Sequence, residues 1–206
     1  MGEELVAGDV VEPGASVPEW VGGRLLLAKD EHGNTRLVAI DPITGALSSI
    51  DVEHREVHEG HFFSGSQYVA NVQIVSPKKY IINTPDTARR AHIKIQVDGA
   101  AKFTAKLSEG ATTDSDGTEL TMHNADREST NVAGTKFYHT PTNAVHGAVV
   151  LREQTAGSNS PVVRIGGTAR NGGEWMLKRN TKYLLEITVA ADNTDISVVF
   201  DFYEEE

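Results

Sequence analysis

The residues best suited to metal chemistry are three histidines in the stretch VEHREVHEGHFF, His54, His58 and His61, which are interleaved with glutamates. On a helix, His54 and His58 would share a face and could hold a metal together with His61. The segment contains HEGH, however, which is one residue shorter than the HExxH zinc motif. We expect a strand here, which would place His54, Glu56 and His58 on one face and His61 on the other. The prediction is a charged surface strand with no metal site.

Two loops match ligand-binding motifs only in part. Residues 164–173, RIGGTARNGG, are glycine-rich but lack the lysine and hydroxyl residue of a P-loop, and no helix follows them. Arg164 and Arg170 could still contact an anion, although an isolated arginine is more often solvated or at an interface. Asp114 and Asp116 lie in TTDSDG, which lacks the distant glutamate that completes a calcium loop. We expect both segments to be connecting loops.

Residues for covalent catalysis are not arranged in a recognisable motif. The chain has no cysteine, which excludes disulfides and thiolate chemistry. There is no GxSxG elbow, and Gly65-Ser66 and Gly157-Ser158 are expected in turns. We predict no catalytic residues, no bound cofactor and no enzymatic activity.

The charge balance argues against nucleic acid as a partner. Aspartate and glutamate number 29 against 19 lysines and arginines, a net charge of -10 with histidine neutral. Such acidity disfavours binding to a phosphate backbone. The opening MGEELVAGDVVEPG has neither the basic nor the apolar part of a signal peptide, and no run of eighteen apolar residues occurs. We expect a soluble chain with no visible export signal and no membrane partner.

The stretch 174–203, EWMLKRNTKYLLEITVAADNTDISVVFDFY, carries the strongest structural signal. Two runs of strand-forming residues flank Ala191–Thr194 and predict a long β-hairpin. Apolar residues alternate with polar ones in both arms, with Leu184 as an exception in the first. The apolar positions are Tyr183, Leu185, Ile187 and Val189, then Ile196, Val198, Phe200 and Phe202.

Further strand candidates recur about every ten residues from position 54 onward, as in a sandwich or barrel. They cover 56–63, 67–75, 79–83, 92–97, 102–108, 118–123, 136–139, 147–152, 162–166 and 175–177. No window has a convincing apolar repeat at helical spacing. The predicted fold class is therefore all-β, a β-sandwich with at most a helical turn or two. The strand count favours a jelly-roll-like order over an immunoglobulin-like one.

The N-terminal quarter differs in composition, so we expect three parts: an extended arm at 1–23, a small β-meander at 24–53 and the sandwich domain at 54–206. Glycine and proline interrupt the acidic first segment, as in arms and mobile termini. It nevertheless carries apolar residues that a solvated tail would not need, and these are the candidate contacts to a capsid or a neighbouring subunit. They are Leu5, Val6, Val10, Val11, Val17 and Trp20.

Three stretches together resemble a group of tailed-bacteriophage virion proteins described as capsid decoration, cement or head-fibre proteins. These are HEGHFF at 58–63, SEGATTDSDGTELTMHNADRES at 108–129 with its Asn124 and Arg127, and the C-terminal stretch. The densest similarity covers Trp175–Lys178, Asn180–Tyr183 and Phe202–Glu204, and the resemblance as a whole spans about 56–206. The first fifty residues are not covered.

The resemblance implies a non-enzymatic virion protein that binds and stabilises the outside of the major capsid shell. Its partners would be the major capsid protein and copies of itself, as a trimer or, next, a dimer. It would be made in the host cytoplasm and located on the outer capsid surface. The alternatives are a receptor- or carbohydrate-binding module of a phage tail or fibre, and a hydrolase with a scattered site.

Overall fold

The computed structural model describes residues 27–29, 35–37, 52–158, 167–170 and 173–205. The chain divides into two compact units, Met1–Ser49 and Ile50–Glu206. In the first unit, β1 (Leu27–Lys29) pairs antiparallel with β2 (Thr35–Leu37). The predicted arm at 1–23 lies outside the described residues. The division at residues 23 and 53 stays a prediction.

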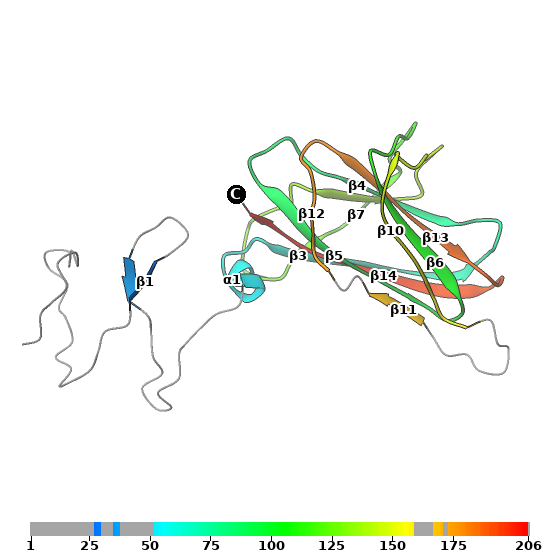
Figure 1. Ribbon diagram of the computed structural model, residues 1–206, viewed down its shortest axis with the longest axis horizontal. Helices are drawn as coiled ribbons and strands as arrows, with labels where there is room; N and C mark the ends of the chain where they lie inside the picture. The colour runs from blue at the N-terminus through cyan, green and yellow to red at the C-terminus, as the bar shows by residue number, and fades with distance from the viewer. Residues whose placement is uncertain (1–26, 30–34, 38–51, 159–166, 171–172, 206) are drawn as a thin grey trace, which may run out of the picture. The chain divides into compact units, whose positions relative to one another are not determined.

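In its described residues, the second unit contains two six-stranded groups of antiparallel strands that pack face to face (Figure 1). The first sheet has the order β10-β6-β13-β4-β9-β7, and its strands are β10 (Val149–Ala156), β6 (Phe103–Glu109), β13 (Lys182–Val189), β4 (Lys78–Asn83), β9 (Lys136–His139) and β7 (Thr118–Leu120). The second has the order β11-β5-β14-β3-β8, with β12 also paired to β5. Its strands are β11 (Gly167–Arg170), β5 (Arg90–Gly99), β14 (Thr194–Glu205), β3 (Phe62–Val72), β8 (His123–Asn124) and β12 (Trp175–Met176). The all-β sandwich is thus confirmed, while the jelly-roll order stays a prediction.

The core lies between the two sheets and is closed by an aromatic cluster. Phe200 of β14 lies with its ring 4.9 Å from that of Phe137 of β9 and 5.6 Å from that of Tyr80 of β4. Phe202 contacts Phe137 and Phe63. Because each buried large apolar side chain contributes about 1.5–3 kcal/mol, this cluster is a principal link between the sheets.

The predicted C-terminal hairpin is wrong. β13 pairs with β4 and β6 in the first sheet, whereas β14 pairs with β3 and β5 in the second. The turn between them, where Asn193 has a φ of 57° and Thr194 Oγ1 donates to Ala191 O, carries the chain from one sheet to the other. The eight alternating apolar residues are buried as expected. They face each other across the core instead of lying side by side.

Leu184, the exception to the alternation, is fully buried on the outer face of the first sheet. It packs there with Ile81, Ala111 and Ala144 in a second small apolar cluster. Residues 111–117 and 140–147 cover this face and are joined by the bridges Thr112↔Val145 and Ser115↔Thr142. We call these two segments the flap. Leu184 is therefore apolar because both faces of β13 are covered.

Several strand boundaries also differ from the predictions. β3 runs without a break over 62–72, so Gly65 and Ser66 lie in a strand and not in a turn. A Cβ on Gly65 would lie 2.4 Å from Met122 Sδ, so a larger residue there would force the Met122 side chain to shift. Part of the predicted glycine-rich loop, Gly167–Arg170, forms β11 against β5. The candidate strand 162–166 lies outside the described residues.

Residues Val52–His58 form the helix α1 and not the strand predicted from position 56. Its seven residues make about two turns, which agrees with the expected limit on helical structure. Glu53 in the first turn and Arg55 and His58 in the last complement the helix dipole. Within the described ranges, no helix has the length and apolar character needed to cross a membrane.

Candidate functional site

A serine, a histidine and a glutamate come together between the flap and the outer face of the first sheet. Ser108 Oγ of β6 lies 2.7 Å from His146 Nδ1 of the flap. His146 Nε2 lies 3.6 Å from Glu186 Oε1 of β13, beyond hydrogen-bond distance, and this buried nitrogen has no hydrogen-bond partner among the described residues. The three residue types are those of a hydrolytic triad. Sequence reasoning missed the arrangement because the residues are 38 and 40 positions apart and no motif links them.

The geometry of these residues fits a structural role better than nucleophilic catalysis. Ser108 is 0% exposed and lies within a strand that is paired on both sides, so a substrate has no access to its hydroxyl. Lys79 Nζ lies 3.1 Å from Glu186 Oε2 and donates a 3.0 Å hydrogen bond to Ala144 O in the flap. The network therefore fastens the flap to the sheet.

The acidic turn at 112–117 is also engaged in contacts within the flap region. Asp116 Oδ1 accepts hydrogen bonds from Lys182 Nζ at 2.6 Å and from Thr113 Oγ1 at 2.7 Å. Burial opposes its ionisation, but these two donors prevail and lower the pKa of Asp116 below its ordinary value. Asp114 accepts from Asn143 Nδ2. Both carboxylates are thus used by the fold, in agreement with the predicted connecting loop.

Glu56, Glu59 and His61 bring one potential metal-ligand atom each to within 4.8 Å of one another at the end of α1. Glu56 is almost fully buried, and its Oε1 accepts a 2.9 Å hydrogen bond from the Arg55 guanidinium. Arg55 also bridges to Glu205 of β14 at 3.0 Å. Hydrogen bonding to Glu56 raises the pKa of Arg55. The Arg55 guanidinium already occupies Glu56 Oε1 and lies 4.0 Å from Glu59, so a cation bound here would lie beside a fixed positive charge.

His54 and His58 do not lie on a strand face as predicted. They lie one turn apart on α1, and their Nε2 atoms are 3.0 Å from each other. The side chain of Glu56, expected on the same face, is buried instead. The prediction failed because the segment has no apolar repeat at helical spacing, and contacts such as the Arg55–Glu205 pair hold the short helix.

The residues of the family resemblance serve the fold. Asn124 Nδ2 donates to Gly60 O at 2.7 Å, and Arg127 Nη1 donates to Asn124 O at 3.3 Å. The backbone N–H of Lys178 donates to the Tyr183 hydroxyl at 2.8 Å. Burial raises the pKa of Tyr183 to about 12. These residues fix loops at the ends of strands.

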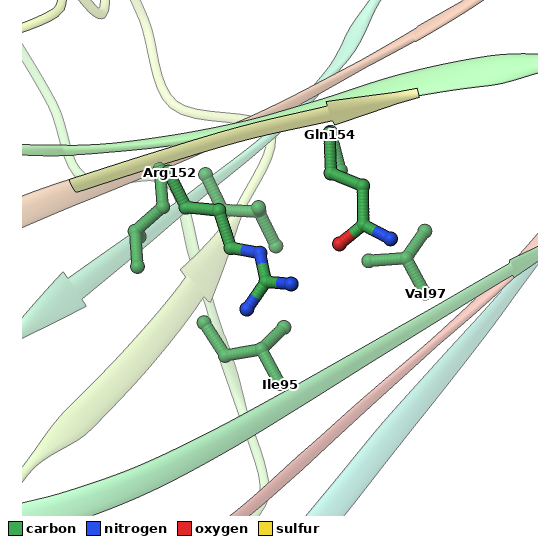
Figure 2. A pocket seen from close by; sticks show the side chains of 7 residues that line it. Ile95, Val97, Arg152 and Gln154 are labelled. Carbon is green, nitrogen blue, oxygen red and sulfur yellow. The ribbon is translucent and has the colours of Figure 1, made fainter. Parts of the chain in front are cut away.

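Two of the hollows on the described part of the sandwich are large enough to hold water or a small ligand. One has a volume of about 280 Å³ and lies beside β7 and β9, with Leu120, Met122 and Val132 among its lining residues. Thr135 also lines it, and its buried hydroxyl has no hydrogen-bond partner among the described residues. The other is a cavity of about 30 Å³ between β5 and β10. Figure 2 shows Arg152 and Gln154 reaching toward Ile95 and Val97 across it, and its volume suits one or two water molecules.

The six candidate contact residues, Leu5, Val6, Val10, Val11, Val17 and Trp20, lie outside the described residues. Arg164 does too. No family model, no curated protein and no solved structure matches the chain.

Proposed function

We propose that the chain is a non-enzymatic structural protein of a tailed-phage virion, which binds the outside of the major capsid shell and stabilises it. The observation that carries the proposal is the division of the chain into two units, Met1–Ser49 and Ile50–Glu206. The second unit has a closed apolar core of its own. The first contains all six candidate contact residues. A cement protein needs this combination of a stable body and a separate attachment segment.

The start of the sandwich unit is fastened in a way that suits this role. Arg55 of α1 pairs with Glu205 of β14, and Glu53 of α1 pairs with Lys94 of β5. Both partner strands lie inside the second sheet. A load applied through the N-terminal unit would thus pass through α1 into the centre of a sheet. An attachment segment that stabilises a shell must transmit such a load.

The charge supports an outer location. A net charge of -10 repels packaged nucleic acid and keeps the surface of a particle soluble. Many copies on a symmetric shell would make weak individual contacts sufficient. The partners in this proposal are the major capsid protein and further copies of the chain, as a trimer or a dimer. The chain would be made in the host cytoplasm.

The test is binding of the purified full chain to expanded, undecorated shells of the phage that encodes it. Co-sedimentation that saturates at a fixed number of copies per capsid subunit, together with a higher temperature of shell disruption, is the expected result. Failure to co-sediment with expanded shells over a range of ionic strengths would contradict the proposal.

The hollow beside β7 and β9 favours a second candidate, a receptor- or carbohydrate-binding module. Its volume of about 280 Å³ approaches that of small-ligand pockets. None of its lining residues is aromatic, so it lacks the stacking surface expected of a sugar site. A glycan array separates the two functions, because a decoration protein gives no specific signal on it.

A further inference from the structure

We propose that His54 and His58 form a two-histidine site for a divalent transition-metal ion of the Ni²⁺, Cu²⁺ and Zn²⁺ class on the exposed face of α1. Imidazole nitrogen is a preferred ligand of these ions. Two histidines at i and i+4 on a helix are the arrangement through which zinc enzymes use helical ligands. The proposal is independent of the capsid function.

The spacing of the two nitrogens fits a shared ion. The Nε2 atoms are 3.0 Å apart, and the ring centroids are 4.6 Å apart. For an ion at the usual distance of about 2.0–2.1 Å from both nitrogens, the nitrogen–metal–nitrogen angle would be about 95°. This is close to the angle between adjacent ligands in square-planar and octahedral coordination, the geometries of Cu²⁺ and Ni²⁺.

The immediate surroundings leave the pair accessible to an ion. Both histidines are exposed. Within the described part of the chain, their only polar side-chain contact is with each other, so binding an ion costs a single hydrogen bond between exposed groups. Such a bond contributes only about 0.5–1.5 kcal/mol. Water or a ligand from a neighbouring molecule would fill the remaining coordination positions.

The neighbouring cluster of Glu56, Glu59 and His61 is the obvious competitor for an ion. It differs from the histidine pair because the Arg55 guanidinium is hydrogen-bonded to Glu56 and lies 4.0 Å from Glu59. An ion bound there would face a fixed positive charge or would have to displace it. Among the described residues, no hydrogen bond or ion pair joins His54 or His58 to a lysine or arginine. The two sites lie on one segment and can be separated by mutation.

A bound ion would also brace the start of the sandwich unit. α1 has only two turns, and a helix of that length is marginal without external contacts. The two imidazoles approach each other only when the helix is formed, so an ion that binds both stabilises the folded state.

The experiment is a calorimetric titration of the untagged full chain with Ni²⁺, accompanied by thermal unfolding with and without the ion. The variants are His54→Ala and His58→Ala, with His61→Ala, Glu59→Gln and His123→Ala as controls. Because His54 and His58 are exposed and alanine favours helix, both variants are expected to fold, as far-UV circular dichroism will verify.

We expect one Ni²⁺ per chain and a rise in unfolding temperature in the wild-type protein. Each of His54→Ala and His58→Ala should weaken binding at least about tenfold, or about 1.4 kcal/mol, and abolish the rise. The three control variants should keep both the wild-type affinity for Ni²⁺ and the rise in unfolding temperature. An equal loss in His61→Ala or Glu59→Gln would move the ion to the competing cluster and overturn the proposal. So would unchanged binding in the two histidine variants, or a wild-type protein that binds no Ni²⁺ at millimolar concentration.

Discussion

Glu204 Oε1 accepts a 2.6 Å hydrogen bond from the backbone N–H of Thr135, and its Oε2 accepts one of 2.9 Å from Gly134. Glu204 lies near the end of β14 in the second sheet, and Thr135 lies immediately before β9 in the first. The carboxylate therefore closes one end of the sandwich by joining the sheets. It is 6% exposed and Thr135 is fully buried, so its loss leaves the buried N–H of Thr135 unpaired.

Glu204→Gln is expected to lower the free energy of unfolding by about 1–3 kcal/mol, because the amide NH₂ replaces one acceptor with a donor facing the backbone N–H of Gly134 or Thr135. The matched control is Glu205→Gln, which removes a partly exposed ion pair to Arg55 and should cost about 1 kcal/mol or less. Chemical denaturation of both variants measures the difference. Equal losses in the two variants would contradict the closing role of Glu204.

Gly117→Ala is expected to destabilise the flap strongly. Gly117 has a φ of 97°, and a Cβ there would lie 2.2 Å from the carbonyl oxygen of His139, which is backbone and cannot move aside cheaply. Gly110 is the matched control, since its φ is 77° but no atom lies within 4 Å of its added Cβ. Gly110→Ala should cost about 1 kcal/mol, the conformational term alone. Hydrogen exchange at the flap amides should accelerate in Gly117→Ala well beyond the change in Gly110→Ala.

Acid should weaken the contact between β12 and β5 through Glu174. Burial opposes ionisation of this carboxyl, but hydrogen bonds from Tyr203 at 2.6 Å and His92 at 2.5 Å, with Lys94 nearby, lower its pKa below the ordinary 4.5. A lowered pKa in the folded state means that the contribution is complete above about pH 4.5 and is lost as pH falls through the folded-state pKa.

The variant Glu174→Gln should therefore lose stability at pH 7 and show a shallower decline in acid than the wild-type protein. Unfolding by urea between pH 3 and pH 7 measures both curves. Glu128→Gln is the control, because Glu128 is exposed and its side chain makes no hydrogen bond or ion pair with another described residue. If the free energy of unfolding declined equally in acid for Glu174→Gln and the wild-type protein, Glu174 would not be the group responsible.

Ser108→Ala tests whether the buried serine and histidine act in catalysis. We expect no hydrolysis of a generic p-nitrophenyl ester by either protein, since Ser108 is inaccessible. The variant should lose about 1–3 kcal/mol of stability because His146 Nδ1 loses its partner. Turnover in the wild-type protein that disappears in Ser108→Ala would revive the hydrolase alternative.

The alternating pattern in β13 and β14 predicted which side chains are buried but not how the strands pair. A strand shows the same period of two in either arrangement. The next strand of the chain can pair with it in the same sheet, or it can lie in the other sheet across the core. The choice depends on β3, β4, β5 and β6, which are distant in sequence and supply the actual hydrogen-bond partners. The fold class was therefore predictable, and the pairing was not.

The candidate site residues were likewise only partly predictable. Leu184 departs from the alternation of its strand because the flap covers it, and Gly65 lies in a strand against Met122 and not in a turn. Neither contact can be inferred from the neighbouring residues in the sequence. His54 and His58 have the spacing of a helical metal pair, but the local sequence favours a strand, whereas the structure has a helix. Ser108 and His146 come together only through the flap. Contacts between distant segments decided each case.

The central claim is that the N-terminal segment attaches the sandwich to a capsid, and deletion of residues 1–21 tests it most directly. Labelled full-length protein and the deletion variant would be titrated against expanded, undecorated shells, with circular dichroism to verify that the sandwich is folded in both. The proposal predicts saturable binding of the full chain and loss of binding by the folded deletion variant. Equal binding of the two proteins would contradict it.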